Sequence, residues 1–311
     1  MGASSVLGTR DIRGMFFKRL EETSIASWAP AISHMFASDQ ASETYKFLGQ
    51  VVSLTEWLGS RKKKEPKPYG FTITNRKFEA SVEFSLDDMR RDKTDQIRVR
   101  IGDLASRAAI LPQKELTTLI LANSNAYDAQ TFFADRSALK TGGQFDNINS
   151  DNIAAPLAPT TAEHTTAILD SIQLILGALD DENEPMNEFA KTFTVMVPTG
   201  YWSVTKAALK NDFSSSGVSN TLVALLGEIT INVIVNPRLT APTSSAGAFY
   251  VFRSDGDVKP FIWQDEVASD LDQLGSGSDY EFFNHAHVYG VTRIGNAGFG
   301  EPAMAVRVDY T

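Results

Sequence analysis

The chain has 311 residues, of which 42% are hydrophobic and 22% charged, and its formal net charge is −9 at pH 7. Because it has no cysteine, disulfides, thiolate metal sites and cysteine nucleophiles are excluded. No apolar run approaches the roughly 18 residues of a membrane span, and the first residues lack the basic-then-apolar order of a secretory signal. The acidic balance argues against nucleic-acid binding by the bulk of the protein.

Two short helices are predicted at the start of the chain. Residues 9 to 22 have apolar side chains at the three- and four-residue spacing of a helix. A second short helix is expected within residues 28 to 36, after Pro30. Both segments precede any long core element, so residues 1 to 44 are interpreted as an N-terminal arm.

Residues 45 to 84 are predicted to form a basic two-stranded arm. Apolar residues of 69 to 73 alternate on one parity, and those of 78 to 84 alternate on the other. Such a change of parity needs a turn or a bulge, which we place at Asn75 and Arg76. The basic residues of this arm are Arg61, Lys62, Lys63, Lys64, Lys67, Arg76 and Lys77.

The charge of the chain is divided between this region and the rest. Residues 60 to 100 hold 12 basic and 7 acidic residues, which leaves 17 basic and 31 acidic residues elsewhere. Complementary patches on one chain favour head-to-tail contact between copies, and such contacts repeat into rings or open arrays. A solvated turn and a nucleic-acid patch are the alternative interpretations of the basic run.

A long helix with a kink is predicted over residues 94 to 123. Its apolar residues step by three and four along one stripe. Because proline removes a helix hydrogen bond and clashes with the preceding turn, Pro112 predicts a kink near Leu111. At 1.5 Å per residue the segment would span roughly 45 Å, the length of a structural beam.

The second half of the chain indicates mixed helices and strands. Residues 140 to 161 have the composition of a loop or connector. Residues 162 to 179 are predicted to form an amphipathic helix. Strands at 192–197 and 228–235, with helical stretches at 200–209 and 219–226 between them, indicate an α/β unit. Later strands are predicted at 248–253, 258–264, 280–294 and 303–310.

Motifs of catalysis are missing from the sequence. It has no nucleotide-binding glycine loop and no Gly-x-Ser-x-Gly elbow. Gly295, Gly298 and Gly300 are interpreted as a tight turn between strands. His285 and His287 are expected on one side of a strand, as ordinary sheet-surface residues rather than metal ligands. We therefore predict no catalytic residue, cofactor or metal.

Acidic residues are concentrated in the segment from 265 to 281, which has six of them and no basic residue. A hydrolase would need a carboxylate pair of this kind. The glycines and serines of the segment favour a solvated loop instead, and that loop is a candidate acceptor for the basic arm. The acceptor candidates are Asp265, Glu266, Asp270 and Asp272.

Several short motifs resemble those of one known family. They are YKFLGQ at 45–50, LTEWLGSR at 54–61, YGFTITNRKFE at 69–79, AAILPQKEL at 108–116, YDAQTFF at 127–133 and YGVTRIGNAGFG at 289–300. In this order and spacing they resemble the major head (capsid) subunit of Mu-like tailed bacteriophages. Many relatives have an Asp-x-Asp-His-Pro sequence after the last Phe of YDAQTFF, whereas this chain has ADRSAL at 134–139, so no role of that His-Pro pair carries over.

The resemblance implies an α+β fold of the Hong Kong 97 capsid type. It implies an extended loop at 45–84 that lies across a neighbouring subunit, and a peripheral domain at 85–160 with a spine helix near 94–123. It also implies an axial domain at 161–247 around five- and sixfold axes. Residues 248–311 would return mainly to the peripheral domain.

The implied function is a structural one, without enzymatic activity. The chain would assemble into pentamers and hexamers of an icosahedral head around double-stranded DNA, which it would not bind sequence-specifically. Portal and scaffold proteins are expected partners, no membrane is involved, and assembly is expected in the bacterial cytoplasm before the protein resides in the virion. The alternatives are a nanocompartment shell protein of the same fold and a carboxylate-dependent hydrolase.

Overall fold

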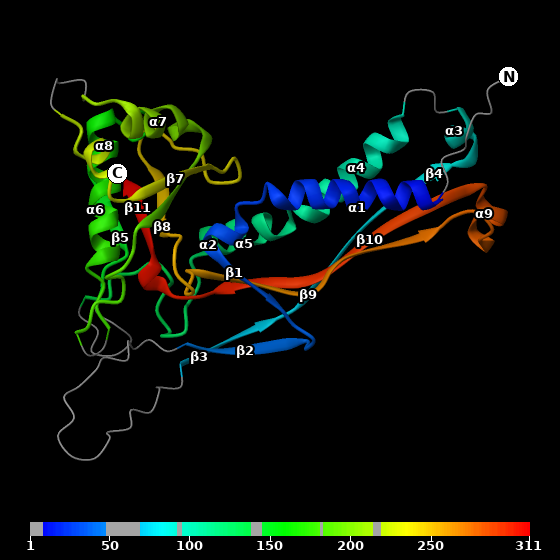
Figure 1. The fold of residues 1–311 in the computed structure, drawn as a ribbon, viewed down its shortest axis with the longest axis horizontal. Coiled ribbons are helices and arrows are strands. Elements are labelled where there is room, and N and C mark those ends of the chain that lie inside the picture. Colours follow the sequence, from blue (N-terminus) through cyan, green and yellow to red (C-terminus); the bar gives the residue numbers. More distant parts are fainter. Residues whose placement is uncertain (1–8, 48–68, 92–94, 138–144, 181–182, 214–218) are drawn as a thin grey trace, which may run out of the picture.

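The computed structural model describes residues 9–47, 69–91, 95–137, 145–180, 183–213 and 219–311. They form a rounded lobe and a long, narrow lobe that extends away from it (Figure 1). A five-stranded sheet lies in the rounded lobe, and a four-stranded sheet runs along the narrow one. A separate pair of strands lies beside the narrow lobe.

The rounded lobe is a mixed sheet with helices packed against it. In spatial order its strands are β5 (Ile148–Asp151), β11 (Ala305–Tyr310), β8 (Gly247–Arg253), β6 (Thr192–Val197) and β7 (Thr230–Val235). The helices are α6 (Thr161–Leu176), η1 (Thr199–Tyr201), α7 (Trp202–Lys210) and α8 (Thr221–Leu225). β6 and β7 are parallel, and α7 and α8 lie between them in the sequence, as a crossover connection requires.

Helix α6 shows how the sequence builds this lobe. It begins with a capping box, in which Thr160 and Glu163 satisfy each other's backbone N–H groups. Its apolar face is buried in the core of the rounded lobe. On the same helix, His164 is fully buried, and its two ring nitrogens lie 2.9 Å from the hydroxyls of Tyr310 and Thr205. Burial lowers the pKa of His164 to about 3, so the ring is neutral and acts as a structural link.

The narrow lobe is an open sheet with two long helices along one face. Its strands, in spatial order, are β1 (Ser33–Ala37), β9 (Phe261–Leu274), β10 (Ala286–Phe299) and β4 (Arg76–Ser85). Its helices are α1 (Thr9–Ile25), α2 (Ala29–Ile32), α3 (Leu86–Arg91), α4 (Gln96–Ala109), α5 (Leu111–Ala122) and α9 (Asp279–Asn284), and η2 (Pro302–Met304) follows β10. α1 and α4 run along β10 (Figure 1), and buried residues of both helices form one core with the sheet.

The predicted kink in the long helix is confirmed. α4 ends at Ala109 and α5 begins at Leu111, with Ile110 between them at ψ 1° instead of a helical value. Pro112 lies in the first turn of α5, where its missing N–H group costs no helix hydrogen bond. Proline therefore ends one helix and begins the next.

The strands of the predicted arm exist, but they do not pair with each other. β3 (Tyr69–Thr74) pairs antiparallel with β2 (Ser42–Phe47), whereas β4 pairs with β10 in the main sheet. The hairpin predicted between residues 69–73 and 78–84 is therefore wrong. Side-chain parity locates two strands and the break at Asn75, but it carries no information on the partner of either strand.

Several other segments differ from their predicted structure. Helix α2 ends at Ile32, and the rest of 28–36 belongs to β1, which runs parallel to β9. The predicted solvated loop at 265–281 is wrong up to Leu274, because β9 continues that far. The predicted strand at 280–294 starts with α9, and His285 caps that helix in a left-handed conformation, so it does not share a strand face with His287.

Gly295 and Gly298 lie inside β10 rather than in a turn. A Cβ atom on Gly295 would lie 2.4 Å from the backbone oxygen of Gln264, and one on Gly298 would lie 2.2 Å from Cδ1 of Ile73. These glycines let neighbouring strands approach β10 closely, which is the reason for glycine at both positions.

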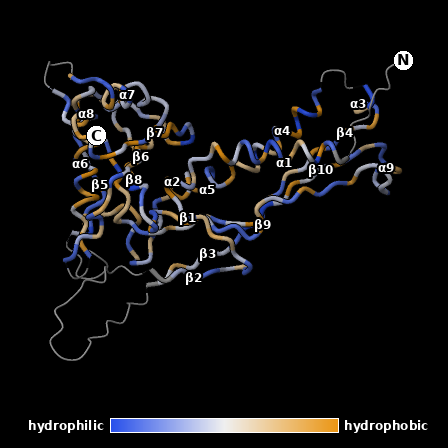
Figure 2. The backbone as a smooth tube through the Cα atoms, in the orientation of Figure 1, coloured by the Kyte–Doolittle hydropathy of each residue, from blue (hydrophilic) through white to orange (hydrophobic). Residues whose placement is uncertain are grey.

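One buried polar residue of β10, Arg293, has its partners within the narrow lobe. Figure 2 shows hydrophilic and hydrophobic residues interleaved along β9 and β10. Arg293 of β10 binds Asp265 of β9, with nitrogen–oxygen distances of 2.7 and 3.1 Å, and its guanidinium lies over the Trp263 ring. In this sheet, therefore, the polar residues of a strand do not all face solvent, because Arg293 is polar and buried.

The two lobes share an aromatic core. Phe132 stacks on Phe299 with ring centroids 4.8 Å apart, and it also contacts Phe261. Phe133, the next residue, contacts Tyr250 of the rounded lobe. Because β8 and β9–β10 contribute to one buried cluster, the lobes are packed against each other rather than tethered by a linker. None of the described helices is long and apolar enough to cross a membrane.

Candidate functional site: assembly surfaces and a buried polar junction

The basic candidates fall into two groups. Arg61, Lys62, Lys63, Lys64 and Lys67 lie outside the described residues. Arg76 begins β4, where its Nη1 lies 3.3 Å from Oε2 of Glu115 on α5 and its guanidinium lies over the Phe78 ring. Lys77 is exposed on β4. Arg76 is thus held by its own chain, whereas Lys77 is exposed on the sheet.

The acidic candidates differ in their exposure and in their contacts. Asp265 is bound to Arg293, which also donates from Nη1 to the carbonyl of Ala108 at 2.9 Å. This ion pair joins β9, β10 and α4, so Asp265 is half-buried and held by its own chain. Glu266 is exposed, but its Oε2 accepts a hydrogen bond of 2.9 Å from Nδ2 of Asn75. Neither carboxylate is free for a basic arm.

Asn75 belongs to a chain of side-chain amides that holds the base of the β2–β3 pair. The Tyr45 hydroxyl donates to Oε1 of Gln264 at 2.9 Å, and Nε2 of Gln264 donates to Oδ1 of Asn75 at 2.8 Å. Gln264 is fully buried on β9. Burial makes this hydrogen-bonded chain costly to break, so it fixes the base of the arm on the narrow lobe.

Asp270 and Asp272 lie on an exposed face of the narrow sheet. They alternate with less exposed residues along β9. The register places Glu79 and Asp270 on either side of Thr292, and it places Glu83 further along the same face of β4. We call Glu79, Glu83, Asp270 and Asp272 the acidic face. Of the basic candidates within the described residues, Lys77 shares this face.

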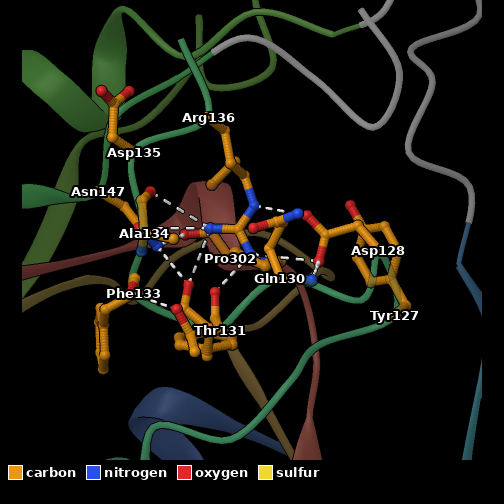
Figure 3. Close-up of polar contacts among 12 residues, drawn as sticks. Tyr127, Asp128, Gln130, Thr131, Phe133, Ala134, Asp135, Arg136, Asn147 and Pro302 are labelled. Carbon is orange, nitrogen blue, oxygen red and sulfur yellow. Dashed lines mark hydrogen bonds and ion pairs between the residues drawn. The ribbon is translucent and has the colours of Figure 1, made fainter. Parts of the chain in front are cut away.

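A cluster of buried polar groups that the sequence did not indicate lies where the lobes meet. We call it the buried polar junction, and it consists of Tyr127, Asp128, Arg136, Asn147 and Glu301. Arg136 is 0% exposed and forms a two-point contact with Asp128, from Nε to Oδ2 at 2.6 Å and from Nη2 to Oδ1 at 3.3 Å. Figure 3 shows the guanidinium enclosed by this carboxylate and by loop carbonyls.

Backbone carbonyls satisfy the remaining donors of Arg136. Nη2 donates to the oxygen of Thr131 at 2.8 Å and Nη1 donates to that of Phe132 at 3.1 Å. Asn147, which precedes β5, donates from Nδ2 to Phe132 and to Pro302. The junction therefore ties the loop of residues 123–136 to the start of β5 and to the connection between β10 and β11.

Glu301 lies in that connection and is buried. The Tyr127 hydroxyl contacts both of its carboxyl oxygens, at 3.1 and 3.2 Å. Desolvation by burial raises the pKa of Glu301 to about 7, although hydrogen bonds from Ala303 and Tyr127 and the nearby Arg136 oppose the shift. Desolvation and the Glu301 carboxylate also raise the pKa of Tyr127. The protonation state of Glu301 therefore changes close to neutral pH.

We expect Glu301→Gln to remove a pH dependence of stability. The folded state holds this proton more tightly than the unfolded chain, whose pKa is near 4.5. The stabilisation is complete below that value and is lost as the pH rises through about 7, by on the order of 2–3 kcal/mol. Urea unfolding at pH 5 and pH 8 should show this loss for the wild type and a smaller one for the variant. Equal losses in both proteins would contradict the assignment.

The arrangement at the junction holds segments together and offers no evident chemistry. Its groups bind one another, and among the described residues no group of three His, Asp or Glu side chains could hold a metal ion. Local sequence patterns contain little signal for the junction, because Tyr127 and Glu301 are 174 residues apart. The motif YDAQTFF contained Asp128, but its partner Arg136 follows in the segment where the family pattern changes.

Comparison with known proteins identifies the family. The family "Mu-like prophage major head subunit gpT" matches residues 11–175 and 230–311. The major capsid protein of Escherichia phage Mu is 28% identical over 126 residues, which cover 39% of this chain and 41% of the Mu protein. The Mu-like prophage FluMu major head subunit of Haemophilus influenzae is 31% identical over 126 residues, 40% of each chain. The matched stretch thus spans about two fifths of each curated relative.

A solved structure supports the fold over nearly the whole chain. The procapsid of bacteriophage JBD30 matches with a TM-score of 0.52 and 19% identity, covering 95% of this chain and 72% of the phage subunit. This likeness confirms the expected α+β fold of the Hong Kong 97 capsid type. Because the family match covers most of the sequence, this chain belongs to the Mu-like major head subunits.

Proposed function

We propose that the chain is the major capsid subunit of a phage head and assembles with copies of itself into a closed shell. The family match over residues 11–175 and 230–311 carries this proposal. The fold supports it, because two lobes fixed by a common core form a rigid tile with several exposed sides. The test is electron microscopy of the expressed protein, in which shells are expected and a monomer at high concentration would contradict the proposal.

Likeness to a capsid fold supports a role for each region of the chain in the shell. The rounded lobe, including residues 161–247, would form the axial domain of pentamers and hexamers. Residues 85–160 and most of 248–311 would form the peripheral domain, with 45–84 as the extended loop and 1–44 as the N-terminal segment. The shell would form in the host cytoplasm with portal and scaffold proteins. It would enclose double-stranded DNA, which an acidic protein would not bind tightly.

We further propose that the basic arm of one copy contacts the acidic face of another. Asp265 and Glu266 are engaged within their own chain, and so is Arg76. Asp270 and Asp272 remain as exposed carboxylates with Glu79 and Glu83 beside them. The complementary charge is the run from Arg61 to Lys64. Exposed ion pairs contribute about 0.2–1 kcal/mol each, so such a contact is weak alone and gains strength through repetition in a shell.

The triple substitution Lys62→Glu, Lys63→Glu and Lys64→Glu is expected to impair assembly without unfolding the subunit. It reverses the charge of the arm, so the acidic face would repel it. Circular dichroism should show a folded protein, while sedimentation and electron microscopy should show fewer shells. Normal shells from this variant would refute the electrostatic contact.

A matched control changes the net charge equally at exposed lysines elsewhere, with Lys18→Glu, Lys206→Glu and Lys210→Glu. This control is expected to assemble better than the arm variant. Adding Asp270→Lys and Asp272→Lys to the arm variant should restore part of the assembly, because the charges are then exchanged. Recovery would identify the acidic face as the acceptor.

The other functions have less support. A nanocompartment shell would share the fold, but the family match favours a phage head subunit. A hydrolase with the carboxylates of 265–281 is not favoured, because the matching family consists of head subunits and Asp265 is held in an ion pair with Arg293.

A further inference from the structure

We propose that Phe282 and Phe283, at the tip of the narrow lobe, pack against a second copy of this chain. The inference rests on the proposed assembly into a shell and concerns an apolar contact, distinct from the charged contact between the basic arm and the acidic face. The two rings lie on α9, which joins β9 to β10 at the end of the molecule far from the rounded lobe (Figure 1). We call Phe282 and Phe283 the phenylalanine tip.

Both rings of the phenylalanine tip lie in solvent in the single subunit. Phe282 is 84% exposed and Phe283 is 79% exposed. Their ring centroids are 5.3 Å apart and nearly perpendicular, so they form one apolar projection. No residue of α9 is buried. Because both rings are exposed, they contribute little apolar burial to the stability of their own subunit.

Polar contacts hold the tip in a defined position. Ser278 caps the helix by accepting a hydrogen bond from the backbone N–H of Glu281. The Glu281 carboxylate accepts from the backbone of Gly277 at 2.5 Å and lies 3.1 Å from Nε2 of His287 on β10. Tyr280 donates to Glu83 on β4 at 3.2 Å. The rings are thus presented on a braced support, which reduces the entropy lost when they bind.

The surroundings of the tip determine which occupant fits. The carboxylates that are part of α9 or contact its ends are Asp279, Glu281, Glu83 and Asp87. Their charge would repel the phosphates of packaged DNA, which disfavours nucleic acid as the occupant. An apolar surface of a neighbouring protein fits better, and in a shell the neighbours are copies of this chain.

The size of the tip agrees with a contact inside a larger assembly. Two phenylalanine rings can bury roughly 300–500 Å². A stable pair of proteins buries about 800 Å² on each partner, so the tip alone would not hold a dimer in solution. It can add to other contacts when many copies close into a shell. We therefore expect the tip to matter for assembly and not to produce a stable dimer.

The decisive variant is Phe282→Ser with Phe283→Ser, compared with Phe282→Leu and Phe283→Leu. The serine pair removes the apolar projection, whereas the leucine pair keeps it. We expect the yield of shells to fall at least about tenfold for the serine pair and to stay near wild type for the leucine pair, if apolar burial supplies the contact. The melting temperature of the unassembled subunit should be similar in all three proteins, because no fold contact is lost. Equal shell yields from serine and wild-type proteins would overturn the inference.

A second measurement identifies the occupant. A benzophenone amino acid in place of Phe283 is expected, after irradiation and mass spectrometry, to be linked to a peptide of another copy. Mixing isotope-labelled and unlabelled subunits distinguishes a link between copies from one within a chain. Links only within the chain, links to a different protein, or no link would each overturn the inference. If the wild type forms no shells, the proposed function fails, while the crosslink in concentrated protein still decides the contact between copies.

Discussion

Replacing Asp128 with alanine is expected to destabilise the subunit by about 3–5 kcal/mol, the usual cost of removing one partner from a buried ion pair. Arg136 would remain fully buried without the carboxylate that it binds directly, since its other hydrogen-bond partners are neutral carbonyls and an amide. Because the guanidinium cannot lose its proton, it cannot escape this cost by becoming neutral. Urea unfolding, followed by circular dichroism, measures the loss.

Two controls separate this effect from a general loss of charge. Glu22→Ala removes an exposed pair with Arg19, and a change below about 1 kcal/mol is expected there. In the double variant Asp128→Leu with Arg136→Met, no buried charge is left unpaired, so it should be more stable than Asp128→Ala. If Asp128→Ala is as stable as the wild type, Arg136 reaches water by another route, and the junction does not hold the lobes together.

Loss of the junction should also affect assembly. Arg136 and Asn147 hold the loop of 123–136, and Phe132 of the same loop packs between the lobes. A subunit with a loosened junction would sample several angles between its lobes. Closed shells require a narrow range of subunit shapes, so Asp128→Ala should reduce shell yield even under conditions where most molecules are folded.

Elements with strong local signals were predictable from the sequence. The break between α4 and α5 follows from one proline within an apolar stripe. The proline and the stripe can both be recognised within a few residues of the break. Strand β6 was predicted at 192–197, as found, because it is an apolar run buried on both faces. Resemblance to the head-subunit family then supplied the fold, which local patterns alone did not specify.

The pairing partners of the strands and the secondary structure of the acidic segment were less predictable. β3 and β4 are adjacent in sequence but pair with strands 22 or more residues away, and nothing in their own residues indicates this. The acidic segment after Gln264 was predicted to be a loop because of its glycines and serines. In the structure the charge of β9 is tolerated since Glu266, Asp270 and Asp272 share the exposed face of the strand.

The buried polar junction was missed for a different reason. Its residues come from three separate parts of the chain, at 127–136, 147 and 301. Each residue looks like an ordinary surface residue in its local sequence, because charged and amide side chains are mostly exposed. Burial becomes possible when the partners meet, and that meeting is a property of the fold.

Gly295 of β10 lies against Gln264, the residue of β9 that holds the base of the β2–β3 pair. Gly295→Ala places a Cβ atom 2.4 Å from the backbone oxygen of Gln264 and 3.1 Å from the Trp263 ring. A backbone atom in a paired strand cannot move aside as a side-chain end can. We expect a destabilisation of about 3 kcal/mol, at the upper end of the usual cost of overpacking.

Gly290→Ala in the same strand is the matched control, because its Cβ meets no atom closer than Oγ of Ser81 at 3.3 Å. This variant should stay within about 1 kcal/mol of the wild type, since Gly290 is half-buried and the one close neighbour of the new methyl group is a side-chain hydroxyl that can turn away. Gln264 also carries the hydrogen bonds to Tyr45 and Asn75, so displacing it should shift the base of the β2–β3 pair. Gly295→Ala should therefore lower shell yield more than Gly290→Ala does, under conditions where both subunits are folded. Equal yields would mean that the position of the arm does not depend on this close approach between β9 and β10.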